Sequence, residues 1–265
     1  AMMGGALGRV VQSKNPDFAV GDLVTNRNGF REFFVSAGKD LTKLAADPDL
    51  PLTVHMHAMG MTGFTAYGGL LHIGQLKDGE QVFVSTAAGA VGSVAAQIAK
   101  IKGCYVVGST GSADKAAWLK DEVGLDAVIN YKEAPIKKAL QDATPNGIDV
   151  YFDNVGGEHL EAALRRMNSL GRIPVCGFIS GYNSGHSSVS NLSNIIYSRV
   201  ILRGFVGTDF PHLHGQFLTD MAAWLKAGKI KDQETVLDGI ANAPSALIGL
   251  MEGRNTGKML VKLAE

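Results

Sequence analysis

The chain has 265 residues, of which 46% are hydrophobic and 19% charged, as expected for a globular protein with one large core or two modest ones. Lysine and arginine together number 25, and so do aspartate and glutamate, so no excess positive charge favours nucleic acid or an anionic membrane surface as a partner. Only Cys104 and Cys176 are present, which excludes a secreted disulfide framework and a four-cysteine zinc site. With no signal-peptide pattern and no apolar run of about 18 residues, we expect a soluble protein of the cytoplasm.

The first 60 residues carry short β-type runs separated by Asn, Pro, Gly and Asp turns. We expect strands at residues 8–13, 22–26 and 33–36. About 60 residues are few for an independent domain, and the chain begins within a strand pattern. We therefore expect that the N-terminal part of this β-rich domain is absent, and a small β extension is the alternative.

From residue 81 onward, short β-rich runs alternate with helical patterns, which predicts a parallel sheet covered by crossover helices. The first helix carries its apolar face through Val94 and Ile98 and ends at Gly103, and the second begins at Ser112 as N-cap and ends at Gly124. The expected strands are residues 81–85, 105–109, 127–130, 149–153, 172–175 and 200–206.

A strand, a tight small-residue turn and a helix start follow one another at residues 82–92, which is the context of a dinucleotide-binding fingerprint. Gly89 lets the backbone approach a pyrophosphate, and Gly92 lets the helix pack closely on the strand. The N–H groups of the helix start then face the phosphates. Ala87 replaces the first fingerprint glycine, so a purely structural turn is the alternative.

The end of the second strand distinguishes NADP from NAD. NAD-binding proteins place Asp or Glu there, whereas this chain has a small, hydroxyl-rich loop at residues 108–112 that ends in Ser112 and is followed by Lys115. Such a loop and a lysine bind and neutralise a 2′-phosphate, which a carboxylate repels. The sequence favours NADPH, with a solvated helix lysine as the alternative for Lys115.

The segment 180–194 is dominated by small polar residues and follows a strand, so we expect a mobile loop. Ligands lie beside such loops in parallel sheets, which makes a lid over the cofactor one interpretation and an idle surface loop the other.

Together with these features, several motifs in the same order and spacing resemble the zinc-independent medium-chain reductases, and most closely the leukotriene B4 dehydrogenase, prostaglandin reductase and curcumin reductase group. The motifs are residues 60–67 (GMTGFTAY), 153–157 (DNVGG) and 176–183 (CGFISGYN). The resemblance implies a partial GroES-like β domain at residues 1–60, a Rossmann NADPH-binding domain at 61–230 and a C-terminal segment at 231–265 that returns to the first domain. It also implies a homodimer.

The resemblance further implies which residues bind the cofactor. For the pyrophosphate it indicates Ala88, Gly89, Ala90 and Val91, beside Gly92 of the fingerprint. For the 2′-phosphate end it indicates Lys115 and Tyr131, beside Ser112. For the rest of the cofactor it indicates Asn154, Cys176, Gly177, Phe178, Ile179, Ser180, Tyr182, Phe205, Val206, Gly207 and Asn255. Thr62 departs from the group's usual proline, which affects only the local rigidity of that turn.

The activity that the resemblance implies is reduction of the carbon-carbon double bond of an α,β-unsaturated ketone or aldehyde, with hydride delivered by NADPH. Tyr182 matches the catalytic tyrosine, whose phenol meets the developing enolate oxygen; a packing or surface role is the alternative. We expect Tyr67 to pack between domains. A quinone reductase and a non-catalytic NADPH-binding protein remain alternative functions.

No metal site is expected. Met61 stands where related zinc enzymes supply a cysteine ligand, and the pairs at residues 55/57 and 212/214 lack a third ligand nearby. Asp153 follows a strand and is interpreted as orienting the turn at Asn154, not as a general base.

Overall fold

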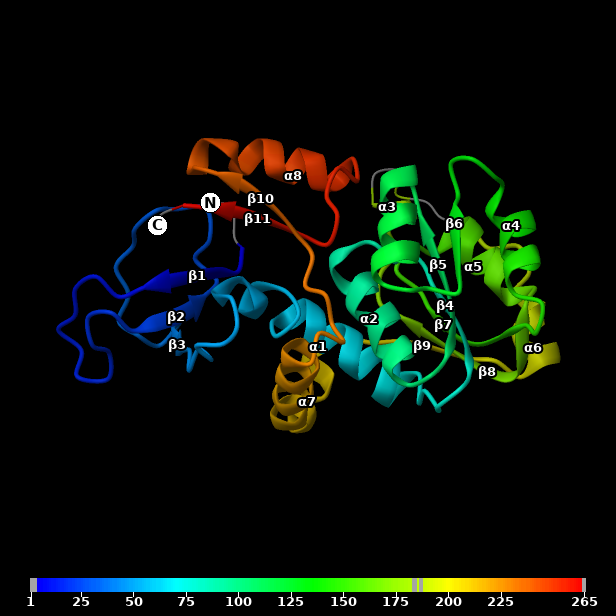
Figure 1. Cartoon of the computed structure of the whole chain (residues 1–265), viewed down its shortest axis with the longest axis horizontal. Coiled ribbons are helices and arrows are strands. Elements are labelled where there is room, and N and C mark those ends of the chain that lie inside the picture. Colours follow the sequence, from blue (N-terminus) through cyan, green and yellow to red (C-terminus); the bar gives the residue numbers. More distant parts are fainter. Residues whose placement is uncertain (1–3, 183–184, 186–187, 264–265) are drawn as a thin grey trace.

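The computed structural model describes residues 4–182, 185 and 188–263, and the strands within these ranges form three sheets. Figure 1 shows the largest sheet with its helices as one body, and the two small sheets at the opposite end of the molecule. The boundaries expected near residues 60 and 230 stay a prediction. In the described ranges, no helix has both the length and the apolar character that a membrane crossing requires.

The largest sheet has six parallel strands in the order β6-β5-β4-β7-β8-β9, which is the doubly wound arrangement. All six strands expected from the sequence are confirmed, with small changes at their ends. Their bounds are β4 Gln81–Val84, β5 Tyr105–Thr110, β6 Ala127–Asn130, β7 Ile148–Phe152, β8 Met167–Val175 and β9 Ile201–Gly204.

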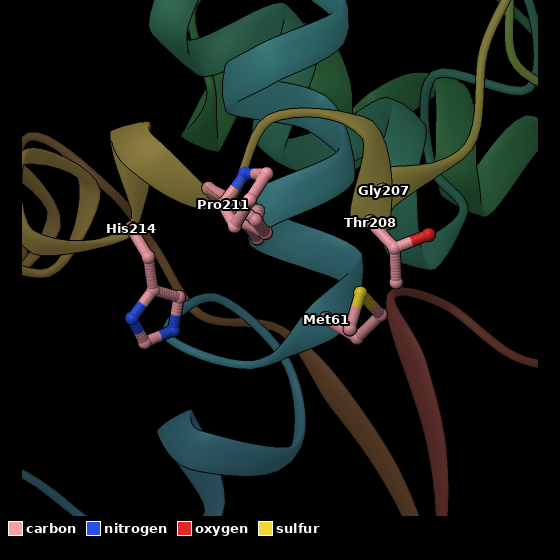
Figure 2. A pocket seen from close by; sticks show the side chains of 6 residues that line it. Met61, Gly207, Thr208, Pro211 and His214 are labelled. Carbon is pink, nitrogen blue, oxygen red and sulfur yellow. The ribbon is translucent and has the colours of Figure 1, made fainter.

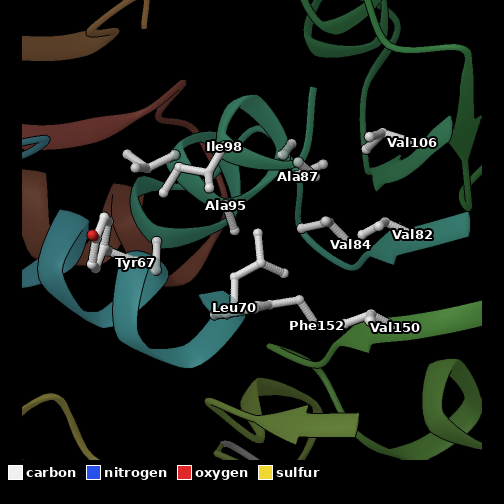
Figure 3. Close-up of a cluster of buried hydrophobic side chains, with 14 of the residues drawn as sticks. Tyr67, Leu70, Val82, Val84, Ala87, Ala95, Ile98, Val106, Val150 and Phe152 are labelled. Carbon is white, nitrogen blue, oxygen red and sulfur yellow. The ribbon is translucent and has the colours of Figure 1, made fainter. Parts of the chain in front are cut away.

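Helices cover both faces of this sheet. Residues of α1, α2 and α7 pack on one face with Val82 and Val84, as Figure 3 shows in part. On the other face, α4 and α5 pack with Phe83, whose ring stacks on that of Tyr151 at 4.8 Å. The helix bounds are α1 Met61–Gly68, α2 Ala90–Ile101, α3 Ala113–Ala117, α4 Ile136–Ala143, α5 Gly157–Leu164, α6 Ser193–Ser198, α7 His214–Lys226 and α8 Ala243–Met251. Burial on both faces explains why these strands read as nearly continuous apolar runs.

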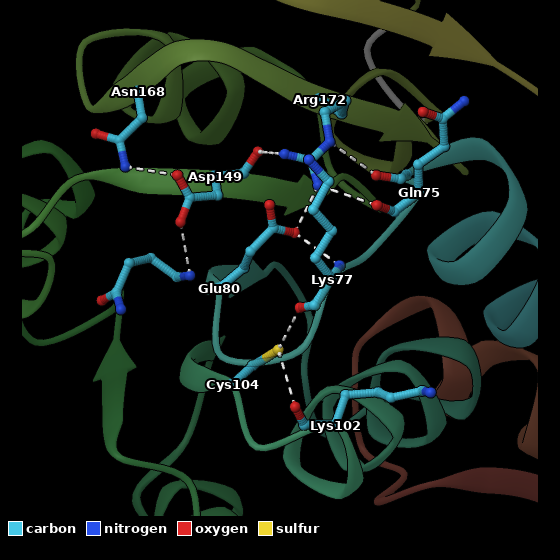
Figure 4. A network of polar contacts seen from close by, with 10 residues as sticks. Gln75, Lys77, Glu80, Lys102, Cys104, Asp149, Asn168 and Arg172 are labelled. Atoms are coloured by element: carbon cyan, nitrogen blue, oxygen red, sulfur yellow. Dashed lines mark hydrogen bonds and ion pairs between the residues drawn. The ribbon is translucent and has the colours of Figure 1, made fainter.

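A polar network fixes the amino end of the sheet, opposite the edge at which ligands bind (Figure 4). The Arg172 guanidinium pairs with Glu80 at 2.5 Å and donates to the carbonyls of Gly74 and Gln75. Asp149 accepts from the Gln81 amide at 2.9 Å. These contacts hold the starts of β4 and β7 against the middle of β8, which helps to fix the spacing of these strands.

The two small sheets are only partly those expected: the strand at 22–26 is confirmed and the strand expected at 8–13 is found shifted to residues 6–9. An antiparallel sheet contains β1 (Ala6–Arg9), β2 (Leu23–Asn26) and β3 (Thr42–Lys43), and a parallel pair contains β10 (Glu234–Asp238) and β11 (Lys258–Lys262). The strand expected at residues 33–36 is wrong. Phe33 is 75% exposed and Val35 fully exposed, because no described part of the chain covers them, so the apolar alternation there has no core to face.

The polar segment after β8 is described only in part. A 3₁₀ turn spans Ile179–Gly181, and α6 begins at Ser193. Asn183, Ser184, His186 and Ser187 lie outside the described residues, so the lid hypothesis stays a prediction.

Candidate active site

Loops from several strands meet at the carboxyl edge of the large sheet. In the strand order, β4 and β7 are neighbours whose connecting helices run to opposite sides, which makes their gap the switch point at which doubly wound sheets bind ligands. The residues that the sequence nominated follow strands β4, β5, β6, β7, β8 and β9, except Asn255, which comes from the C-terminal segment. Parallel pairing alone brings these loops to one edge.

The turn after β4 has the form that a phosphate requires. Gly89 is the N-cap of α2 and has an extended backbone. The Ser93 amide donates to the Gly89 carbonyl, so the amides of Ala90, Val91 and Gly92 before it have no carbonyl partner within the helix. A Cβ at Gly92 would lie 2.2 Å from the Thr86 carbonyl oxygen, so only glycine lets the helix lie this close to the turn. These free amides and the bare glycine surface fit a pyrophosphate.

The missing first glycine of the fingerprint is compensated by its neighbours. Ala87 is fully buried and donates its amide to Ser109 at 2.8 Å. A Cβ at Gly108 of β5 would lie 2.7 Å from the Ala87 methyl, so the glycine opposite leaves room for this methyl group. The left-handed backbone conformation falls on Thr86 instead, with φ +51°. The turn therefore forms without glycine at position 87.

The C-terminal segment closes against this turn. The Gly257 amide donates to the Ala88 carbonyl at 2.8 Å, and Gly89 and Gly257 form an isolated bridge. Asn255 is buried, and its side-chain amide donates to the Gly257 carbonyl at 2.7 Å. Lys115 donates to the Gly253 carbonyl at 2.6 Å. The segment thus joins the turn after β4 to the loop of Lys115 and brings Asn255 near that turn, and the contact of Asn255 with the cofactor stays a prediction.

The nominated 2′-phosphate residues lie together after β5 and β6. Ser112 is the N-cap of α3, as expected, but its side chain makes no capping hydrogen bond. A Cβ at Gly111 would lie 2.7 Å from the Tyr131 hydroxyl, so the phenol lies over the bare backbone of this loop. Burial lowers the pKa of Lys115 below its ordinary value. A half-buried lysine and two hydroxyls are groups that bind a phosphate dianion.

The ring of Tyr131 packs against His159 of α5. The two rings meet edge to face with centroids 5.2 Å apart. Burial lowers the pKa of His159 from 6.5 to about 4, so the folded protein holds this imidazole neutral at physiological pH.

This buried imidazole predicts acid sensitivity. The unfolded chain binds the proton between pH 6.5 and 4 and the folded chain does not, so the stability that His159 contributes is complete above 6.5 and is lost as the pH falls toward 4. His159→Phe keeps the ring contact and removes the titration. Relative to wild type, the free energy of unfolding of this variant should gain about 2 kcal/mol between pH 7 and pH 5 in urea titrations. Parallel pH curves for the two proteins would contradict this assignment.

The turn after β7 is held by a buried carboxylate. Asp153 Oδ1 accepts from the amides of Val155 and Gly156 at 2.9 and 2.8 Å and from the Tyr151 hydroxyl at 2.6 Å. Burial raises the pKa of Asp153. The interpretation of Asp153 as the residue that orients this turn is confirmed.

Ser85 joins this turn to the pyrophosphate turn. Its hydroxyl accepts from the Asn154 amide at 2.9 Å, and its carbonyl accepts from the Asn154 side chain at 2.7 Å. Sequence reasoning missed Ser85, although a polar residue that directly follows a buried strand was a signal. Asn154 is thereby fixed at the switch point.

The segment after β8 lies against the Asn154 turn. The Asp153 carbonyl accepts from the amides of Cys176 and Gly177, and Ser180 donates its hydroxyl to the Val155 carbonyl. Burial, with the charge of Asp153, raises the pKa of the Cys176 thiol to about 12, so this thiol is no nucleophile.

Two aromatic residues of this segment lie near glycines: Phe178 near Gly156 of the turn after β7, and Tyr182 near Gly177 at the end of β8. A Cβ at Gly156 would lie 2.2 Å from the Phe178 ring, so this ring packs directly on Gly156, whereas Ile179 is exposed. Tyr182 is 62% exposed, and its hydroxyl lies 3.6 Å from the position of a Cβ on Gly177. The phenol is therefore accessible near the ends of β7 and β8, and its catalytic role stays a prediction.

In the segment after β9, one nominated residue is buried in the core and the next two lie at the surface. Phe205 is buried against Phe152 and Phe210, so any cofactor contact there comes from its backbone. Val206 is exposed. Gly207 borders a hollow of about 200 Å³, which Figure 2 shows. Its other lining residues are Met61, Phe64, Thr208, Pro211 and His214.

Tyr67 is structural. Its hydroxyl donates to Asp220 of α7 at 2.6 Å, and its ring packs on Phe217 and Trp224 of the same helix. Burial and this contact raise the pKa of Tyr67. Tyr67 and α7 both lie within residues 61–230, the range expected for the cofactor domain, so these contacts do not place Tyr67 between domains as expected.

A family model described as zinc-binding dehydrogenase matches residues 90–226, and one described as the N-terminal domain of oxidoreductase matches residues 1–44. The chain belongs to the zinc-binding dehydrogenase family. Prostaglandin reductase 1 of Bos taurus is 46% identical over 98% of this chain and 81% of its own length. The NADP(+)-dependent 2-alkenal reductase of Nicotiana tabacum is 42% identical over 98% of this chain and 77% of its own length. The CurA structure with NADPH from Vibrio vulnificus has a TM-score of 0.92 at 40% identity, and the match covers all of this chain and 80% of that one. These relatives confirm the resemblance to the medium-chain reductases and the Rossmann fold.

Zinc, which the family description implies, does not fit the described residues. Among them, no three His, Cys, Asp or Glu side chains lie close enough together to hold a metal ion. His57 Nε2 lies 2.8 Å from the Ala90 carbonyl and Nδ1 lies 2.6 Å from Asp232, so both ring nitrogens face protein groups. Met61, which the sequence analysis placed at a cysteine ligand of related zinc enzymes, offers only a thioether, which is a poor zinc ligand. No step below involves a metal.

Proposed function

We propose that this protein reduces the carbon-carbon double bond of α,β-unsaturated ketones or aldehydes with hydride from NADPH. One observation carries the proposal: the accessible phenol of Tyr182 lies at the same sheet edge as a glycine turn and a basic loop that fit the two phosphate ends of NADPH. The names of the bovine and tobacco relatives, and the NADPH in the CurA structure, support the same activity and cofactor.

The residues divide the work along the edge. The amides of Ala90 to Gly92 bind the pyrophosphate, while Ser112, Lys115 and Tyr131 bind the 2′-phosphate. NADPH, when bound, supplies hydride to the β-carbon of the substrate. As charge gathers on the carbonyl oxygen, Tyr182 donates a hydrogen bond to it and then a proton. The enol that results tautomerises in water to the saturated carbonyl compound, and solvent returns a proton to Tyr182.

The deciding experiment mixes the protein and NADPH with a panel of enones, alkenals, quinones and saturated aldehydes, and identifies each product by mass. The proposal requires saturated ketones or aldehydes from the enones and alkenals. Turnover with quinones alone would support a quinone reductase. NADPH affinity without any turnover would support a binding protein.

Replacing Lys115 should weaken the binding of NADPH far more than the binding of NADH. Because a hydrogen bond to a charged group contributes about 1.5–3 kcal/mol, Lys115→Gln should weaken NADPH binding about 10- to 100-fold. NADH should lose far less, since the lost contact with Gly253 affects both cofactors equally. Fluorescence titration measures both affinities, and Lys120→Gln, an exposed site nearby, is the control. Equal losses for NADPH and NADH would refute the phosphate contact.

We also propose a homodimer formed through the outer edge of β9. All four residues of β9 are exposed, and no described strand pairs with that edge. Ile196 and Tyr197 of the adjacent α6 are more than 70% exposed, which extends the apolar surface. Light scattering during size-exclusion chromatography measures the mass.

We infer a cytoplasmic location from the two free cysteines, which suit a reducing compartment, and cell fractionation tests it.

A further inference from the structure

Lys132 lies in the loop that faces Lys115, although the sequence analysis did not nominate it. The pairing of β5 and β6 aligns Thr110 with Asn130, and the Tyr131 amide continues it by donating to the Thr110 carbonyl at 3.1 Å. Tyr131 and Lys132 therefore follow the strand end beside Gly111. A Cβ at Gly111 would lie 3.4 Å from Cε of Lys132, so this side chain turns back over the loop.

The positive charges of this loop are not neutralised within the protein. In residues 4–182, 185 and 188–263, neither Lys115 nor Lys132 forms an ion pair with a carboxylate. After burial, the charge of Lys132 is the second cause that lowers the pKa of Lys115, so the two ammonium groups repel each other. An anion bound near both ammonium groups would relieve this repulsion.

We propose that Lys132 is a second cationic ligand of the cofactor's 2′-phosphate and that, together with Lys115, it determines the preference for NADPH over NADH. This inference rests on the proposed NADPH-dependent function. Tyr131, whose ring packs on His159, fixes the start of the loop, and the Lys132 side chain lies over Gly111 beside the Tyr131 phenol.

The neighbouring lysines do not share this position. Lys138 pairs with Asp142 at 2.6 Å, one turn later on α4. Lys137 is exposed on the same helix and carries the same charge, which makes it a matched control for any general change in electrostatic attraction.

The test measures the dissociation constants of NADPH, NADH and 2′,5′-ADP for wild type, Lys132→Gln, Lys132→Arg and Lys137→Gln at low and high salt. Lys132→Gln should weaken NADPH and 2′,5′-ADP about tenfold at low salt and leave NADH within about twofold. Lys132→Arg should retain most of the affinity, and Lys137→Gln should match wild type.

Two outcomes would overturn the inference: the same NADPH affinity for Lys132→Gln and Lys137→Gln, or an equal loss of NADPH and NADH in Lys132→Gln. A wild-type protein that binds no NADPH would instead overturn the proposed function, so the two failures are distinguishable.

Discussion

Replacing Gly92 with alanine should abolish cofactor binding. The added methyl carbon would lie 2.2 Å from the Thr86 carbonyl oxygen and 3.1 Å from the Ala87 Cα, and both are backbone atoms that cannot move without moving the turn. A displacement of about 1 Å in a binding turn costs roughly 100-fold, so NADPH affinity should fall by at least this factor. The overpacking should also lower the free energy of unfolding by about 2 kcal/mol. Titration with NADPH and urea unfolding measure the two effects.

Gly215→Ala is the matched control for this substitution. Gly215 is also a glycine in the first turns of a helix, α7, but a Cβ there would meet nothing within 4 Å. Alanine should stabilise the protein by up to about 1 kcal/mol, because it has the higher helix propensity, and should leave NADPH binding unchanged. If both variants bound NADPH as wild type does, the close approach at Gly92 would have no role in the site.

The large sheet was predictable because burial on both faces constrains composition. Because both faces of strands such as β4 and β7 are covered by helices, nearly all of their residues must be apolar, and such runs are easy to recognise in the sequence. Parallel pairing then brings the carboxyl ends of these strands to one edge. The positions of Gly89, Lys115 and Tyr182 at that edge follow from strand order alone. The segment 33–36 was mispredicted because alternation indicates a core-facing side without showing that a core is present.

Other features of the site have no local signal. The bond between Lys115 and the Gly253 carbonyl joins positions 138 residues apart, and no periodicity predicts that contact. The Ala87 methyl, where the fingerprint predicts glycine, fits because of the room that Gly108 leaves on the neighbouring strand, and the left-handed conformation falls on Thr86. Lys132 was missed because a single lysine is chemically ordinary until its neighbours are known.

Removing the hydroxyl of Tyr182 should slow turnover and spare the cofactor. Phenylalanine keeps the exposed ring near Gly177 and removes only the group that donates to the enolate oxygen. General acid help of this kind contributes about 10²- to 10⁴-fold, so kcat with an enone should fall at least 100-fold. NADPH affinity should stay within about twofold, because the pyrophosphate and 2′-phosphate contacts lie on other loops.

The split between turnover and binding distinguishes catalysis from packing. A packing role would lower cofactor affinity and stability together with kcat, whereas a donor to the developing charge lowers kcat and kcat/KM in step and leaves the NADPH titration unchanged. Tyr105→Phe, which removes a phenol hydroxyl at the start of β5, at the opposite end of that strand from the site, controls for the loss of a tyrosine hydroxyl. Unchanged kcat in Tyr182→Phe would remove this residue from the mechanism and leave the proton to come from solvent or from another group.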